Sequence, residues 1–138
     1  LASDATVDAD LGATRLLTTL GATAGPYAGL NAYITPTLGG GSCIVFLNAA
    51  SCGGPPTASL PARALGLGQY SSTPFLLVGI EGDFVTKHLI RCGDSVEDVT
   101  ANAGPMTFVY VARAPSIDPS TCKQVFTLED GTQTTTGI

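Results

Sequence analysis

Residues 74–92, PFLLVGIEGDFVTKHLIRC, restrict the fold more than any other stretch of the chain. The run 75–80 is apolar without alternation, which is typical of a strand covered on both faces. Gly82 can adopt the positive φ that a short hairpin loop demands. The stretch therefore predicts two strands joined by a tight turn at residues 81–83, with the first strand central in an all-β structure.

The second strand of this hairpin alternates in polarity. Its more apolar face carries Phe84, Thr86, His88 and Ile90. Its other face carries Val85, Lys87, Leu89 and Arg91, where long basic side chains can cover the sheet with their stems and keep their charges in water. The pattern thus predicts that the only histidine of the chain points toward the apolar side of a sheet.

Seventeen glycines and nine prolines divide the rest of the chain into short segments. Strand patterns occur at residues 15–20, 27–35, 43–49, 106–113 and 122–128. One short helix is expected at 93–103, with Asp94 or Ser95 as its cap. Together these segments predict a single domain over residues 1–138, an antiparallel β-barrel or sandwich of about seven to eight short strands.

Charge and hydropathy limit the partners. The formal net charge is -5, and the six Lys and Arg residues form no basic run, so nucleic acid and anionic membrane surfaces are not expected. No apolar run approaches the roughly 18 residues of a transmembrane helix, so no membrane span is expected. The start LASDATVDAD resembles a mature chain after signal-peptide removal, which predicts a secreted, extracellular protein.

Four cysteines, Cys43, Cys52, Cys92 and Cys122, point to the same compartment. An even count in a short chain predicts two disulfides, for which three pairings are possible. We favour Cys43–Cys52 with Cys92–Cys122, because the first pair brackets a short Gly/Ala/Ser segment. These loops would stabilise the fold by about 2.7 and 3.7 kcal/mol. No metal site and no cofactor are expected, since one histidine and scattered cysteines match no common zinc set.

The only candidate base for catalysis is His88, with Glu81 and Asp83 nearby in the sequence. No serine lies in a Gly-x-Ser-x-Gly context that would mark a nucleophile, so the sequence favours a non-enzyme. A secreted hydrolase or hydrolase inhibitor using His88 is the alternative. A barrel that binds a small molecule or lipid is another, and His88, Phe108 and Tyr110 would then line its lumen.

Tyrosine and amide side chains suggest a binding surface. Tyr27, Asn31 and Tyr33 share the outer face of the strand expected at 27–35, and tyrosine offers contact area with little entropy to lose. The irregular segment 57–70, which ends in Tyr70, could add contacts as a long loop. Tyrosine is also a common strand residue, so an ordinary strand surface explains the same pattern.

The start LASDATVDAD, the segment SCIVFLNAASC, the later Cys92 and Cys122 and the glycine-rich β character together resemble a family of fungal proteins. These are the elicitors of plant-pathogenic fungi, such as the hypersensitive-response-inducing elicitors of the rice blast fungus. The resemblance implies a secreted, monomeric, non-enzymatic effector that induces host defence or cell death by binding a host protein or cell-surface component. It implies no catalytic residues.

Overall fold

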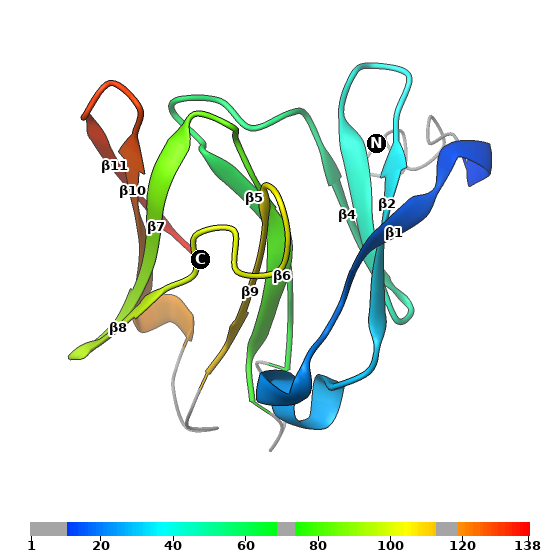
Figure 1. Ribbon diagram of the computed structural model, residues 1–138, viewed down its shortest axis with the longest axis horizontal. Helices are drawn as coiled ribbons and strands as arrows, with labels where there is room; N and C mark the ends of the chain where they lie inside the picture. The colour runs from blue at the N-terminus through cyan, green and yellow to red at the C-terminus, as the bar shows by residue number, and fades with distance from the viewer. Residues whose placement is uncertain (1–10, 69–73, 113–118) are drawn as a thin grey trace.

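A computed structural model describes residues 11–68, 74–112 and 119–138, and these residues form three antiparallel sheets (Figure 1). The first sheet has the order β1 (Arg15–Thr19), β2 (Asn31–Pro36), β3 (Ser42–Phe46), β4 (Ala49–Gly53). The central sheet has the order β5 (Ala62–Leu67), β6 (Leu76–Glu81), β9 (Thr107–Val111). The third sheet has the order β11 (Gln133–Gly137), β10 (Cys122–Leu128), β7 (Val85–Cys92), β8 (Ser95–Asp98). Three short 3-10 turns complete this part of the chain, η1 (Leu11–Ala13), η2 (Ala22–Tyr27) and η3 (Pro119–Thr121).

The central sheet lies between the other two and is covered on both faces (Figure 1). Leu76 and Val78 of β6 pack with Phe46 of the first sheet, whereas Leu77 packs with Phe126 of the third sheet. The prediction that residues 75–80 form a strand covered on both sides is therefore confirmed. Position 79 of this strand requires glycine, because a Cβ atom there would overlap the β5 backbone.

Each outer sheet is joined internally by one disulfide. Cys43 and Cys52 lie directly opposite each other on β3 and β4, and they are bonded. Cys92 and Cys122 lie directly opposite each other on β7 and β10, and they are bonded as well. The favoured pairing is confirmed, and both bonds connect strands that already share a hydrogen-bonded ladder.

Three expectations about secondary structure are wrong. The strands β6 and β7 do not form a hairpin, because β6 pairs with β5 and β9 in the central sheet whereas β7 pairs with β10 and β8 in the third sheet. The connection at residues 81–83 therefore leads from one sheet to another, and Gly82 does not have the positive φ of a tight hairpin loop.

Residues 93–103 do not form a helix, because Ser95–Asp98 pairs with β7 as strand β8 after a turn in which Gly93 has a φ of 59°. The described residues contain eleven strands, more than the seven to eight expected. The additional strands are β4, β5 and β8, whose sequences alternate weakly and which are held by pairing with stronger neighbours. The described strands form no closed barrel.

The alternation expected in β7 is correct only at its later residues. Lys87 pairs with Thr127 and Val85 pairs with Leu128, so Thr86 is an extra residue in a β-bulge. The bulge turns Thr86 to solvent and brings Val85 against the core, the reverse of the expected orientation. His88 and Ile90 face the core as predicted.

Candidate functional site

Three polar side chains are enclosed between the central and third sheets, and we call Glu81, His88 and Gln124 the buried array. Their exposed fractions are 3%, 0% and 8%. Gln124 donates from Nε2 to the Gly137 carbonyl at 3.0 Å, which leaves its Oε1 as an acceptor 2.8 Å from His88 Nε2. His88 therefore donates from Nε2. Its Nδ1 lies 3.7 Å from Glu81 Oε1.

The walls of the buried array are aromatic rings and backbone. The His88 ring stacks on Phe126 at 4.3 Å between centroids and meets the edge of Phe108 at 4.5 Å. The backbone N–H of Ala101 donates to Glu81 Oε1 at 3.0 Å. A general base must reach the proton that it abstracts, and solvent does not reach this ring. Within the array only His88 and Gln124 are hydrogen-bonded to each other, and His88 Nδ1 has no hydrogen-bond partner among the described residues. The array is thus a buried hydrogen-bonded pair that connects β7 with β10, beside a buried carboxylate.

The other sequence candidates are dispersed. Asp83 is exposed in the turn between β6 and β7. Tyr27 lies in η2, where it is 8% exposed and its hydroxyl donates to the Pro74 carbonyl at 2.9 Å, so it is not part of an exposed patch. Asn31 and Tyr33 do share an exposed face of β2, and Asn31 Nδ2 donates to the Tyr33 hydroxyl at 3.3 Å. Tyr70 lies outside the described residues.

A cleft of about 630 Å³ opens between η2, the turn that connects β1 with β2, and strand β9 of the central sheet. We call it the inter-sheet cleft. Its lining includes the hydroxyls of Thr18, Thr19 and Thr23, the carboxylate of Glu97, the amide of Asn102, and Val111. These residues come from segments far apart in the chain, so no local sequence pattern indicates the cleft.

Strand β9 borders the inter-sheet cleft with its outer edge. Asn102 covers part of that edge, since its side chain accepts from the Val109 N–H and donates to the Val109 carbonyl, both at 2.8 Å. On the same outer edge, the Thr107 N–H donates to the Gly104 carbonyl, and the Thr107 carbonyl accepts from the Ala103 N–H. Alternate residues of an antiparallel strand point their backbone groups to the same side, so Val111 also points outward. Among the described residues, none pairs with the backbone N–H and C=O of Val111.

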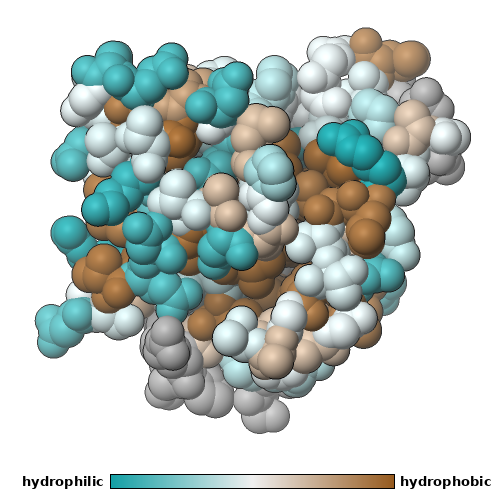
Figure 2. Space-filling model, viewed as in Figure 1, coloured by the Kyte–Doolittle hydropathy of each residue, from teal (hydrophilic) through white to brown (hydrophobic). Residues whose placement is uncertain are grey.

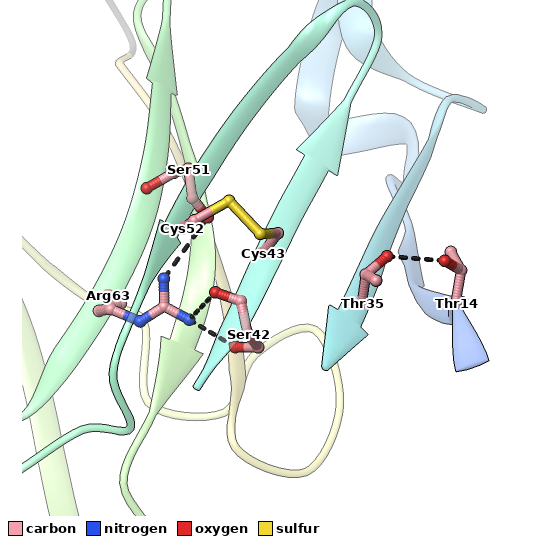
Figure 3. Close-up of a disulfide and its surroundings, with 7 residues drawn as sticks. All are labelled: Thr14, Thr35, Ser42, Cys43, Ser51, Cys52 and Arg63. Atoms are coloured by element: carbon pink, nitrogen blue, oxygen red, sulfur yellow. Dashed lines mark hydrogen bonds between the residues drawn. A yellow bond between two sulfur atoms is a disulfide. The ribbon is translucent and has the colours of Figure 1, made fainter. Parts of the chain in front are cut away.

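The side chain of Arg63 connects the central sheet to the first sheet near the Cys43–Cys52 disulfide. Arg63 of β5 donates from Nη2 to the carbonyl and hydroxyl oxygens of Ser42 and from Nη1 to the Ser51 carbonyl (Figure 3). Its aliphatic stem packs on Gly53, where a Cβ atom would lie 3.1 Å from Arg63 Cδ. Burial lowers the pKa of this guanidinium from its usual value. Arg63 therefore acts as a fixed connection between two sheets, a role that sequence reasoning missed.

The described residues contain no group of three or more His, Cys, Asp or Glu side chains that could hold a metal ion. In the same part of the chain, no helix has the length and hydropathy needed to cross a membrane. Comparison with known proteins finds no matching family model, no matching curated protein and no matching solved structure. Any statement about function must therefore come from the residues themselves.

Proposed function

We propose that this chain is a secreted, non-enzymatic effector that induces plant defence or cell death by binding a host component. The resemblance to fungal elicitors supports the biological role. Two disulfides are compatible with an extracellular protein. The complete burial of His88 supports binding over catalysis, because the only histidine of the chain does not meet solvent. We interpret the three layers as a sandwich, since side chains fill both spaces between the sheets.

The inter-sheet cleft is the proposed binding site, and a short extended segment of a host protein is the proposed ligand. The observation that carries this proposal is a cleft of about 630 Å³ bordered by the edge strand β9, where the backbone of Val111 has no partner among the described residues. An extended peptide adds to such an edge by main-chain hydrogen bonds, while neighbouring pockets select its side chains. The exposed Thr23, which lines the cleft, would supply a polar contact near that edge.

The test uses folded protein applied to leaf tissue, with ion leakage as the measure of cell death. The Thr23→Trp variant fills the rim of the cleft from an exposed position. The Val111→Pro variant removes the open N–H, and proline is tolerated where a strand N–H faces away from its ladder. Asn48→Trp is the matched control, because Asn48 is exposed in the β3–β4 turn.

We expect each cleft variant to lower the potency about tenfold or more, as loss of a central contact does. The Asn48→Trp control should match the wild type. Absence of any response to the wild-type protein would contradict the effector proposal. A full response to both cleft variants would contradict the cleft as the binding site and leave the effector proposal standing.

A further inference from the structure

The outer face of the third sheet gathers half of the basic residues of the chain. Lys87, Arg91 and Lys123 are exposed there, out of six Lys and Arg residues in total. The strand register brings Lys123 directly opposite Arg91, and Lys87 opposite Thr127. We call these three residues the cationic face. Figure 2 shows hydrophilic side chains gathered over this sheet. The sequence has no basic run, so only the pairing of β7 with β10 reveals the cluster.

Stability and edge protection do not explain the cationic face. Like charges directly opposite each other in a sheet are destabilising. Lysine protects edge strands from pairing with other molecules, but β7 and β10 are the two inner strands of this sheet. The chain is acidic overall, with eleven Asp and Glu residues. Among the described residues of the four strands on this face, only Asp98, which lies opposite Leu89, offsets the positive charge, and it interacts with the charge of Lys87. An arrangement that costs stability in an acidic protein indicates a function for the charge.

The spacing of the three charges limits the kind of ligand that can bind to this face. Lys87 and Arg91 are four residues apart on β7, about 13 Å at the rise of a strand. The row between them holds the half-buried side chains of Leu89 and Val125. The described part of this face therefore carries positive charge at both ends of a strip, and the single carboxylate of Asp98 lies beside Leu89 within that strip. The same part of the face has no aromatic side chain on β7, β10, β8 or β11 that points outward.

We propose that the cationic face binds a linear acidic polysaccharide. Carboxylates of the sugar chain would meet Arg91 and Lys123 at one end of the strip and Lys87 at the other, with Arg91 able to hold a carboxylate through two parallel hydrogen bonds. Nucleic acid fits less well, because single strands bind by stacking bases on aromatic rings. A lipid surface also fits less well, because Val96 is the only exposed large apolar side chain described on this face.

The test is binding to polygalacturonate, with fully methyl-esterified polygalacturonate as the uncharged control polymer. Wild-type protein should bind only the charged polymer, and binding should weaken as salt screens the exposed charges. The triple variant Lys87→Gln, Arg91→Gln, Lys123→Gln should lose about tenfold or more in affinity, and Arg91→Gln alone about threefold, as expected for exposed ion pairs. Arg15→Gln removes one exposed positive charge on the first sheet and should change affinity less than about twofold.

A second variant separates function from folding. Lys123→Glu replaces two opposed like charges with an opposite pair, so it should raise Tm while it weakens binding to polygalacturonate. The proposal is overturned if the triple variant binds like the wild type, if Arg15→Gln weakens binding as much as Arg91→Gln, or if the protein binds phosphatidylserine vesicles but not the polymer. These results are independent of the leaf response, because the cationic face lies on the outer side of the third sheet.

Discussion

The two spaces on either side of the central sheet are filled in different ways. The space toward the first sheet holds an apolar core that includes Ile44, Phe46 and Val78. The space toward the third sheet also has large apolar side chains, but they enclose the buried array. An apolar core tolerates changes that keep its volume. A buried polar group requires its specific partner, so the His88–Gln124 hydrogen bond in the second space fixes the register of β7 and β10 more strictly than the apolar contacts in the first space fix theirs.

The largest expected difference concerns the two disulfides. Replacing Cys92 and Cys122 with Ala should lower the free energy of unfolding by about 3.7 kcal/mol. The same change at Cys43 and Cys52 should lower it by about 2.7 kcal/mol, because the Cys43–Cys52 bond closes a shorter loop. The sequence separations are 30 and 9 residues. Denaturant unfolding of both double variants measures this. Equal losses, or a larger loss for the shorter loop, would show that loop entropy does not set the difference.

Removing the His88 imidazole tests whether the space toward the third sheet requires its specific polar partners. His88→Leu keeps a similar volume but leaves Gln124 Oε1 without its donor, and it should cost about 2 to 3 kcal/mol. The control Ile44→Leu, in the apolar core, should cost less than about 1.5 kcal/mol. Adding Gln124→Leu to His88→Leu should recover part of the loss, since the unsatisfied acceptor is then removed. If His88→Leu costs no more than Ile44→Leu, the two spaces are equivalent and the comparison fails.

A smaller effect is expected at the margin of the apolar core. Arg63→Lys keeps the charge but loses the fork that reaches both Ser42 and Ser51, so unfolding should become easier by about 1 to 2 kcal/mol. Arg15→Lys, at an exposed position, should stay within about 0.5 kcal/mol of the wild type. Thermal unfolding at neutral pH measures both. Equal stabilities would mean that the Arg63 contacts add nothing beyond charge.

The smallest effect concerns a turn at the end of β8. Hydrogen bonds from the Thr100 hydroxyl and N–H lower the pKa of Asp98 below its usual value. The resulting stabilisation is present above the unfolded pKa of about 3.9 and is lost as the pH falls through the folded pKa. Because Asp98 is exposed, solvent screening limits the effect to about 0.5 kcal/mol or less. Asp98→Asn should flatten this part of the unfolding profile, and an unchanged profile would contradict the assignment.

Local sequence patterns predicted the features that depend on neighbouring residues. The unbroken apolar run of β6 predicted a strand covered on both faces, and the alternation around His88 and Ile90 predicted their inward direction. The spacing of the cysteines predicted the pairing. At residues 93–103 the cap signals predicted a helix, but pairing with β7 prevailed, as tertiary contacts often do over weak local preferences.

Features that depend on strand register could not be predicted from one sequence. Gln124 reaches His88, and Lys123 faces Arg91, only because β10 pairs with β7 in a particular register. The bulge at Thr86 changes that register by one residue, which reverses the side chains on one side of it. The inter-sheet cleft combines loops and strand ends from both halves of the chain, so neither its lining nor the open edge at Val111 has a local signal.

We propose that His88 serves the packing and register of the third sheet and that the surface of the protein carries its function. The most direct test is leaf ion leakage induced by folded His88→Phe protein, in which an aromatic ring still fills the space between Phe108 and Phe126. We expect the response of this variant to equal that of the wild type at the same concentration of folded protein, while Thr23→Trp is about tenfold or more less potent. A folded His88→Phe protein that induces no response would contradict the claim and would favour a hydrolase that uses His88.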